Sequence, residues 1–505
     1  MYEPTYQLDQ SRAPFLEGLV RYSSEDVIPF HTPGHKQGRT LDPELQQALG
    51  NEPFLMDVSD EISDPGSGND SAAVLLEAEA LAADAFGAGR TFFLHNGTTA
   101  GIQAMLLAAS WEFEQTRGSD WPKDKPGEVV LPRSVHRSVF GGLVLAGLTP
   151  RFVEETWDKE WSIPLPPSPS AWQKAVGETD GLAAVFDTYP SYYGIGGKIN
   201  ETFYLADALD KLLLVDEAHG AHFRFHPEFP PTALSIGASA VAQSAHKTLG
   251  VLTQASLLHT GKPELAELMP TILALLQSTS PSFLLYASLD AGRRQMALEG
   301  RRLWQRALEL SQETRASINR VPGLRCLDEE VLEKPGVGFW DPTKLLIRVD
   351  GLGLSGPEAE VRLRQCGIQV ELAGLNHILV LITIGDGPQE VRRLVEALRE
   401  LARSKGSGVQ KQQEAPIESP ALGRMLLSPR RAVLSARREV DLREAKGGIS
   451  SGTVTPYPPG IPILVPGEEI TAESLECLDG YRRQGIEIRG WAHLGRKTIW
   501  VVDDD

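Results

Sequence analysis

This chain of 505 residues is short of three features that would each point to a particular class of protein. It has only three cysteines and no CxxC spacing, which leaves a zinc site, a thiol redox pair and a disulfide framework unsupported. Lysine and arginine number 49 against 67 aspartates and glutamates, and the net charge of −18 argues against nucleic-acid binding. The chain also lacks a bilayer-spanning apolar run and the basic and apolar regions of a signal peptide. We therefore expect a cytoplasmic, enzyme-sized protein without nucleic-acid or membrane partners.

Short apolar runs alternate with helical patterns between residues 90 and 259. Six such runs occur, at residues 91–95, 128–131, 182–187, 211–216, 240–244 and 255–259. Buried parallel strands joined by crossover helices produce this pattern. The predicted fold is therefore α/β, with a mostly parallel central sheet and helices on both faces. Ligands of such sheets bind beyond the carboxyl ends of the strands.

The rest of the chain divides into smaller parts. A long helical pattern over 284–318 leads into a second α/β region, with strand patterns at 344–349 and 377–384 and a helical pattern at 358–365. The polar stretch at 403–420 has the composition of a linker. We predict five parts: an N-terminal arm (1–30), a large α/β domain (31–290), a small α/β domain (291–402), a linker (403–425) and a C-terminal domain (426–505).

The strands predicted at 211–216 and 240–244 are both followed by reactive groups. Asp216 comes after four aliphatic residues, and Lys247 ends the sequence Ser-Ala-His-Lys. A carboxylate at a buried strand end is costly unless it is paired, and a partly desolvated lysine can become a nucleophile near neutral pH. The combination suits pyridoxal 5′-phosphate (PLP), which binds a lysine and needs an acid at its pyridine nitrogen. A helix N-cap aspartate and an ordinary surface lysine are the structural alternatives.

Residues next to this pair favour a flat cofactor. Ala218 is small enough to leave space for a ring, and His219 can bond a ring hydroxyl. Ser244 and His246 precede the lysine and can donate to a phosphate. The sequence Asp-Glu-Ala-His also occurs in helicases, but the GxxxxGK[ST] loop that a helicase requires is absent from the chain.

A phosphate loop is predicted in the sequence FFLHNGTTAG at residues 92–101. A strand ends there in a turn at Gly97 and a helix begins, so that backbone N–H groups and the hydroxyls of Thr98 and Thr99 can bind a phosphate. His136 follows another predicted strand, and its imidazole can stack on a cofactor ring. A threonine helix cap and a structural histidine are the alternatives.

Together these residues resemble the PLP-dependent enzymes of the aspartate-aminotransferase fold, known as fold type I, and further motifs resemble the Orn/Lys/Arg decarboxylase family. Residues 30–36 (FHTPGHK) are similar to the family's PGHK signature, and residues 189–194 (YPSYYG) to its P-T-Y-Y-G turn. Residues 456–462 (PYPPGIP) and 466–468 (PGE) resemble the signature of its C-terminal domain. Two further similar segments are 67–71 and 279–290. The resemblance extends from about residue 11 to about residue 495 and fits the short, wingless biosynthetic type.

The resemblance implies an activity and the catalytic residues. The activity is PLP-dependent decarboxylation of arginine, lysine or ornithine, which feeds polyamine or diamine synthesis. Lys247 is implied to bind the cofactor, Asp216 to pair with the ring nitrogen and His136 to stack on the ring. The proton donor to Cα is either His136 or a residue of the C-terminal domain.

The resemblance also implies phosphate ligands and a homodimer. Thr98, Thr99, Ser244 and His246 are implied to serve the phosphate of the same chain. Thr279 and Ser280 are implied to reach the phosphate of a neighbouring subunit, because this fold usually builds its sites at a dimer interface.

One departure from the family leaves the substrate open. The family commonly has Ala-Glu shortly before PYPPGIP, whereas this chain has Ser451-Gly452, so an acid that could contact a substrate cation is absent. Other acids remain as candidates for that contact: Asp57, Asp60, Glu61, Asp64, Glu468 and Glu469. Two other functions also remain open. One is transamination or α-oxoamine synthesis, with Arg348 as a candidate clamp for a substrate carboxylate, and the other is a non-catalytic regulatory role.

Overall fold

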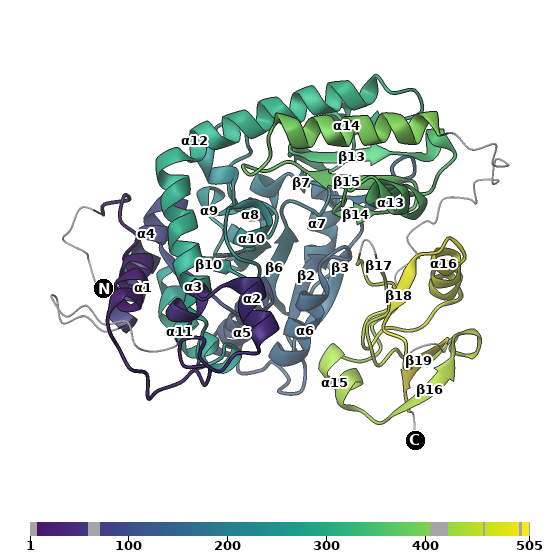
Figure 1. The fold of residues 1–505 in the computed structure, drawn as a ribbon. Helices are drawn as coiled ribbons and strands as arrows, with labels where there is room; N and C mark the ends of the chain where they lie inside the picture. Colours follow the sequence, from purple (N-terminus) through teal and green to yellow (C-terminus); the bar gives the residue numbers. More distant parts are fainter. Residues whose placement is uncertain (1–7, 59–70, 405–422, 458–459, 494–496, 504–505) are drawn as a thin grey trace. The chain divides into compact units, whose positions relative to one another are not determined.

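The computed structural model describes residues 8–58, 71–404, 423–457, 460–493 and 497–503, and Figure 1 shows their helices and strands. The chain forms two compact units. The first unit consists of Met1–Ala104 and Glu217–Trp304, and the second of Met105–Asp216 and Gln305–Asp505. Most of the predicted linker and of the motif at 67–71 lies outside the described residues. Among the described helices, none is both long and apolar enough to span a membrane.

The first unit contains a sheet of three antiparallel strands, β1 (Arg90–Leu94), β9 (Ala240–Gln243) and β10 (Ser256–Thr260). β10 pairs with β1 on one side and with β9 on the other. All three strands match predicted runs to within one residue, but the antiparallel direction of β10 is an exception to the predicted parallel pattern. A parallel return needs a crossover of about a dozen residues or more, usually a long helix. Between β9 and β10 only the one-turn helix α10 (Ala245–Thr248) forms.

The second unit contains four parallel strands in the order β8 (Leu212–Asp216), β6 (Leu182–Thr188), β2 (Glu128–Pro132) and β3 (Thr149–Val153). The first three confirm predicted runs, and every residue of β8 is buried. β3 was not predicted, because its sequence TPRFV contains a proline and an arginine. Both are tolerated because, within the described chain, β3 pairs with β2 alone, and edge strands accept proline.

The small α/β region predicted from the sequence is also part of the second unit. Its antiparallel sheet has the order β11 (Arg325–Cys326), β13 (Lys344–Arg348), β15 (His377–Leu381) and β14 (Leu372–Ala373). Helix α13 packs against β14, β15 and helix α14, whose apolar face buries Leu394 and Leu398. The bounds of these helices are Gly356–Gln365 for α13 and Pro388–Arg403 for α14.

Residues 423–503 form a C-terminal segment with a hydrophobic cluster of its own. The cluster contains Leu464, Ile470, Leu478 and Ile499, all fully buried. The C-terminal segment contains two helices, α15 (Pro429–Leu434) and α16 (Ala472–Arg483). It also contains two antiparallel strand pairs, β16 (Arg437–Asp441) with β19 (Thr498–Val502) and β17 (Thr455–Tyr457) with β18 (Glu487–Arg489). The exact boundaries of the five predicted parts stay a prediction.

The remaining elements connect these sheets. In the first unit they are α1 (Pro14–Ser24), α2 (Pro43–Leu49), α3 (Glu52–Met56), α4 (Ser71–Phe86), α9 (Ala233–Ile236) and α11 (Pro263–Leu276). In the second they are α6 (Arg137–Ala146), β4 (Thr156–Asp158), β5 (Ile163–Leu165), α7 (Pro169–Gly177), β7 (Ile195–Gly197), α8 (Ile199–Asp207) and β12 (Val337–Trp340). Two further helices, α5 (Gly97–Thr116) and α12 (Phe283–Asn319), begin in the first unit and end in the second. The helix predicted at 284–318 is confirmed as α12.

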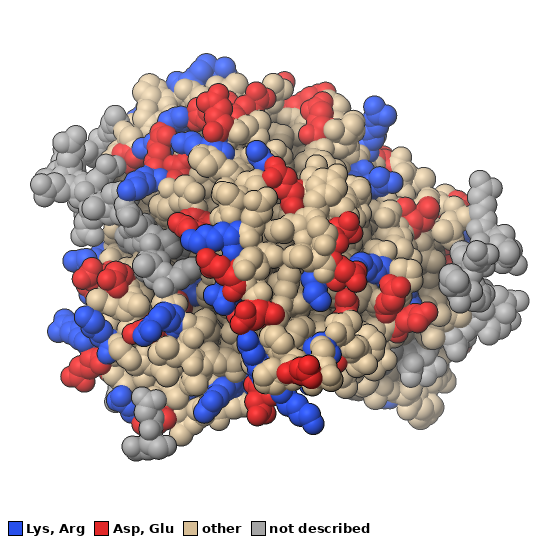
Figure 2. Space-filling view, turned by 180° about the vertical axis from the view of Figure 1, so that it is seen from behind, with Lys and Arg blue, Asp and Glu red and all other residues tan. Residues whose placement is uncertain are grey.

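The excess of acidic residues does not form one continuous field on the face shown in Figure 2. Acidic and basic side chains alternate across that face, with neutral residues between them. Mixed charge of this kind keeps a protein soluble without creating a strong field of one sign.

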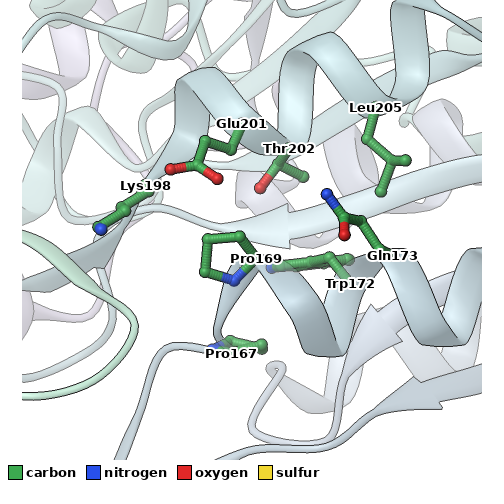
Figure 3. Close-up of a pocket in the computed structure, with 8 residues that line it drawn as sticks. All are labelled: Pro167, Pro169, Trp172, Gln173, Lys198, Glu201, Thr202 and Leu205. Atoms are coloured by element: carbon green, nitrogen blue, oxygen red, sulfur yellow. The ribbon is translucent and has the colours of Figure 1, made fainter.

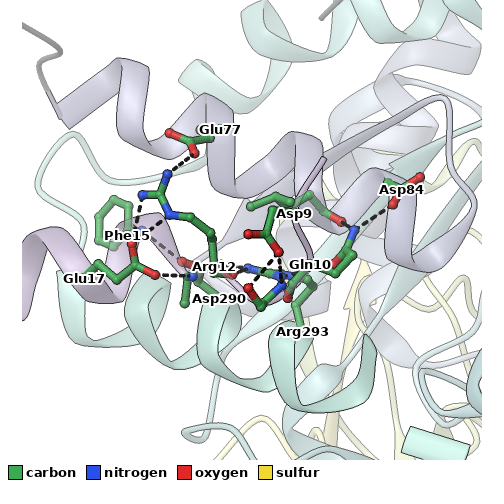
Figure 4. Close-up of polar contacts among 12 residues, drawn as sticks. Asp9, Gln10, Arg12, Phe15, Glu17, Glu77, Asp84, Asp290 and Arg293 are labelled. Carbon is green, nitrogen blue, oxygen red and sulfur yellow. Dashed lines mark hydrogen bonds and ion pairs between the residues drawn. The ribbon is translucent and has the colours of Figure 1, made fainter. Parts of the chain in front are cut away.

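The segment before α1 is anchored by a buried ion pair on α12. Arg293 and Asp290 lie 2.5 Å apart, and their side chains are 1% and 0% exposed. Arg293 donates to the carbonyls of Gln10 (3.0 Å) and Arg12 (2.6 Å), and the Phe15 N–H donates to Asp290 (2.9 Å), as Figure 4 shows. The two charges therefore hold backbone groups of the N-terminal arm as well as each other.

We expect Asp290→Ala to lower the free energy of unfolding by about 3–5 kcal/mol, because it leaves the Arg293 guanidinium buried without its carboxylate. Glu299→Ala is the matched control, since Glu299 forms an exposed i,i+3 pair with Arg302 on the same helix. Its cost should stay below about 1 kcal/mol. Urea denaturation followed by circular dichroism measures both, and equal effects of the two variants would contradict the anchoring role.

Candidate active site

Lys247 and His219 meet in the first unit. Lys247 lies in α10, directly after β9, and its side chain is half-buried. Its Nζ is 3.0 Å from Nε2 of His219, which is 4% exposed. The structure thus brings together the proposed nucleophile and the histidine that the sequence predicted to lie beside the cofactor ring.

Three hydroxyl groups cluster where α5 begins. The Thr98 hydroxyl is 2.5 Å from the Ser244 hydroxyl and 3.0 Å from that of Ser256. Gly97 starts the helix with φ of +72°, a conformation that favours glycine. Hydroxyls at the N-terminus of a 20-residue helix are suited to a phosphate. Thr99 is the next residue of the same turn, and it is exposed.

Ser256 was missed by the sequence prediction for a specific reason. It is the first residue of β10, and a parallel strand would have placed it at the opposite end of the sheet from Ser244. Because β10 is antiparallel to β9, the start of β10 lies beside the end of β9. The lack of a long helical pattern between the two strands was the signal that could have revealed this direction.

The predicted hydrogen bond from His246 to a phosphate depends on which of its ring nitrogens carries a proton. Its Nδ1 is 3.1 Å from the carbonyl oxygen of Ala255, so Nδ1 carries the proton of the neutral ring. Burial lowers the pKa of His246, and the nearby Lys247 charge lowers it further, against the opposing effect of the Ala255 carbonyl. In the neutral ring Nε2 is an acceptor, so a bond from Nε2 to phosphate requires the protonated form that burial disfavours.

Thr279 and Ser280 lie between α11 and α12, and both are exposed. The Ser280 N–H donates to the Ser278 hydroxyl at 3.1 Å, which fixes the backbone of this turn. Their exposure is consistent with the predicted contact to the phosphate bound by a neighbouring subunit. That contact stays a prediction.

Asp216 is the last residue of β8 and is 4% exposed. Thr188 is its partner in β6, and the Tyr189 N–H donates to the Asp216 carbonyl at 2.9 Å. The backbone on both sides of this carboxylate is thereby fixed, and its position at the carboxyl end of a parallel strand is as predicted. Ala218, two residues later, is 8% exposed.

His136 caps the N-terminus of α6, at the carboxyl end of β2. Its Nδ1 is 2.8 Å from the Ser138 hydroxyl and accepts the Ser138 N–H at 3.2 Å. Nδ1 is therefore an acceptor in the neutral ring, and Nε2 carries the proton. The imidazole is held in one orientation yet is exposed, which fits the predicted stacking on a flat ligand.

Two carboxyl groups at the carboxyl ends of these strands were not predicted, one half-buried (Glu155) and one buried (Asp187). Glu155 follows β3 and accepts hydrogen bonds from the Ser134 N–H (2.8 Å) and the Ser134 hydroxyl. Asp187 lies in β6 and accepts the Thr188 N–H at 2.8 Å. Burial raises the pKa of each to about 7, and for Asp187 the nearby Glu155 charge contributes to the increase. Polar residues within an apolar strand, as in LAAVFDT, were the available signal.

Three of the six acids proposed for the substrate cation lie among the described residues, and each of the three has a basic partner. Asp57 pairs with His35 of the PGHK motif at 3.2 Å, and Glu469 pairs with Arg424 at 3.1 Å. Glu468 is buried and accepts from Arg133 at 2.7 Å, so it is unsuited to a substrate. The remaining candidates, Asp60, Glu61 and Asp64, lie outside the described residues.

Arg348 is similarly occupied. It forms ion pairs with Asp350 (2.5 Å) and Glu160 (2.8 Å), and the hydrogen bond to Asp350 is the main reason that its pKa is raised. An arginine neutralised by two carboxylates is a poor clamp for a substrate carboxylate, which weakens the transaminase alternative.

A small pocket lies between α7 and α8 (Figure 3). Its volume of about 20 Å³ is enough for a water molecule but not for an amino acid. None of its lining residues was predicted to be functional: Pro167, Pro169, Trp172, Gln173, Lys198, Glu201, Thr202 and Leu205.

The residues present fit PLP. The first unit supplies an amine hydrogen-bonded to an imidazole and, at a helix N-terminus, a cluster of three hydroxyls. The second unit supplies a buried carboxylate at a strand end and an exposed, oriented imidazole. These are the donor types that a phosphate, an aldehyde, a pyridine nitrogen and a flat ring require.

Comparisons with known proteins identify the fold class. The solved structure of the constitutive lysine decarboxylase of E. coli matches with a TM-score of 0.80 and 21% identity, over 98% of this chain and 82% of that chain. The fold is α/β, of PLP fold type I, as the sequence predicted. The mixed strand directions described above belong to that fold.

Family models and relatives then identify the family. The model for the Orn/Lys/Arg decarboxylase major domain matches residues 13–390, and the model for the C-terminal domain matches residues 416–483. An arginine decarboxylase of Bacillus subtilis (strain 168) is 35% identical over 490 residues, 96% of both chains. One of Bacillus anthracis is 34% identical over 507 residues, 99% of both. This chain belongs to the Orn/Lys/Arg decarboxylase family.

The buried Asp187 should make stability depend on pH. An acid whose pKa is about 7 in the folded protein and 3.8 when unfolded holds its proton more tightly when folded, so stability is lost as pH rises between these two values. In Asp187→Asn the loss of stability between pH 4.5 and 8 should shrink by about 3 kcal/mol, given about 1.4 kcal/mol per pKa unit.

Urea unfolding at a series of pH values from 4.5 to 8 checks this expectation. Asp180→Asn is the control, because Asp180 is exposed just before β6 and its pKa is lowered by a bond to Lys125. An unchanged pH slope in Asp187→Asn would show that this carboxyl group is not neutral in the folded protein.

Proposed function

We propose that this protein is a PLP-dependent decarboxylase that acts on a basic amino acid, with arginine as the preferred substrate. The structural observation that carries the proposal is the Lys247 amine, held 3.0 Å from His219 in the same unit as the three hydroxyls at the start of α5. Arginine is favoured because the relatives at 34–35% identity are named arginine decarboxylases, whereas the constitutive lysine decarboxylase of E. coli is 24% identical.

Each proposed residue has a role that follows from its surroundings. Lys247 binds the cofactor, and His219 orients the Lys247 amine through their hydrogen bond. Thr98 and Ser244 hold the phosphate with Gly97, whose conformation starts the helix. Ser256 orients the Thr98 hydroxyl.

Asp216 and His136 act on the ring of the cofactor. We propose that Asp216 keeps the pyridine nitrogen protonated and that His136 stacks on one face, with Ala218 leaving room at the other. When bound, PLP supplies an electron sink for the bond pair left behind when carbon dioxide departs, and a proton then replaces the carboxylate at Cα. His136 Nε2 carries a proton in the neutral ring and is a candidate donor.

The substrate cation is not explained by the family's acid before PYPPGIP. Ser451 is buried, and its hydroxyl donates to the Ala432 carbonyl at 3.1 Å, so its role is structural. A side chain added at Gly452 would meet no atom within 4 Å, so packing does not force glycine there. We propose that acids elsewhere bind the cation and that the product enters polyamine synthesis.

We further propose a homodimer in the cytoplasm. Exposed apolar side chains in the first unit support a second copy: Ile28, Phe30, Leu45, Leu49 and Leu275. The exposed Thr279 and Ser280 are available to the neighbouring subunit. Three free cysteines are consistent with a reducing compartment.

Lys247→Ala should abolish the visible absorbance band of the bound cofactor and reduce the rate by about 10²-fold or more, since it removes both the covalent link and a positioned proton-transfer group. Lys262→Ala, at the start of α11, is the control and should keep the band. Absorbance spectroscopy with added PLP measures the first effect. A wild-type protein without such a band would refute the cofactor assignment.

Carbon dioxide release should be fastest with arginine when arginine, lysine and ornithine are supplied at equal concentrations with PLP and no keto acid. We expect kcat/KM to favour arginine by about 10²-fold or more, because buried groups that bond a guanidinium are left unpaired by the other two side chains. A reaction that requires a keto acid would instead indicate transamination.

A further inference from the structure

Both proline-rich motifs of the C-terminal segment meet one arginine of the parallel sheet. Arg133 follows β2 directly, and its side chain is 7% exposed. Its Nε donates to the Pro462 carbonyl (3.1 Å), and its Nη2 donates to the Ile463 carbonyl (2.8 Å) and to Glu468 (2.7 Å). PYPPGIP and PGE therefore form a receptor for a single guanidinium. The proposed function gives no role to this contact.

The backbone and the carboxylate that bind the Arg133 guanidinium have little conformational freedom. Gly467 has φ of +90°, and a side chain there would approach the Leu427 carbonyl oxygen to 2.2 Å, so the glycine of PGE is required. The Glu468 carboxylate also accepts the N–H groups of Val465 (3.2 Å) and Gly423 (3.0 Å). Arg133 reaches this carboxylate through Nη2 while its Nε meets the Pro462 carbonyl, so two separate donors fix the position of the guanidinium as well as its charge.

The same arginine begins the loop that carries His136. After Arg133, Ser134 bonds Glu155 through its N–H and its hydroxyl, and Val135 is fully buried. His136 then caps α6 through Ser138. Four consecutive residues are thus fixed, and the first of them is fixed by the C-terminal segment. The loop between Arg133 and the His136 imidazole therefore has little conformational freedom.

We infer that Arg133 is a positioning residue through which the C-terminal segment, by Glu468, holds the His136 imidazole against the cofactor. The inference rests on the proposed function for the role of His136. Arg133 itself contacts neither substrate nor cofactor. Its charge pairs with Glu468 and also partly opposes the rise in the pKa of Glu155. Loss of the Arg133–Glu468 ion pair would therefore leave Arg133 free to move. The favourable electrostatic interaction between Arg133 and Glu155 would then weaken as well.

Glu468→Gln is the decisive variant, because glutamine keeps the size of the side chain and one of its two acceptor oxygens but removes the charge. We expect the PLP dissociation constant to rise and kcat to fall, each by about tenfold or more, with KM within about twofold. Arg133→Lys keeps the charge but loses the separate Nε and Nη2 donors. It should raise the PLP dissociation constant and lower kcat, but by less than Arg133→Gln does.

Arg151→Gln is the matched control. Arg151 lies in β3 and pairs with Glu128 at the start of β2 (3.2 Å). The variant therefore removes an ion pair between β2 and β3 that does not involve the C-terminal segment. We expect this variant to keep the PLP dissociation constant and kcat of the wild type.

Hydrogen exchange of the cofactor-free protein gives a readout that does not depend on activity. In Glu468→Gln the amides of residues 134–139 should exchange about tenfold faster than in Arg151→Gln. Unchanged exchange, or a lower melting temperature with unchanged PLP affinity and kcat, would overturn the inference. If the wild type bound no PLP, the proposed function would fail, and faster exchange would still support the hold of Glu468 on the loop.

Discussion

The structure depends on how polar groups at the ends of buried strands find partners. β8 and β9 are fully buried, so the groups that follow them leave an apolar interior and must be hydrogen-bonded at once. Lys247 meets His219, and Ser244 meets Thr98. Since the start of β10 lies beside the end of β9, the same requirement that stabilises the first unit also gathers the hydroxyls of Ser244 and Ser256 around Thr98, where they can bind a phosphate.

The C-terminal segment extends this requirement to distant parts of the sequence. Arg133 and Glu468 are both buried, and neither charge would be tolerated there alone. Their pairing joins a strand end of the sheet to motifs more than 300 residues later. PYPPGIP supplies the Pro462 carbonyl and PGE the Glu468 carboxylate for one guanidinium, and Ile463 between them supplies a second carbonyl.

Much of the fold could be predicted from apolar runs. The six predicted strands are present within a residue or so, and the long helix after residue 283 is confirmed. The direction of β10 and the edge strand β3 were missed, because direction depends on the connection and an edge strand can be half-polar. Of the predicted site, Thr98 with Ser244 and Lys247 with His219 do come together. Ser256, Glu155 and Arg133 were missed, since their partners are set by strand order and not by neighbours in sequence.

The sequence by itself determined the family, the strand-end residues suited to PLP and the motifs of the C-terminal segment, because local patterns and residue types carry that information. Only the tertiary structure decided the hydrogen-bond partners of His136 and His246, the raised pKa values of Glu155 and Asp187, and the partners of Glu468 and Arg348. The physical reason is that burial and the identity of a hydrogen-bond partner are properties of chain segments brought together by folding. A carboxylate that seemed available to a substrate in the sequence is, in the fold, already bound to an arginine.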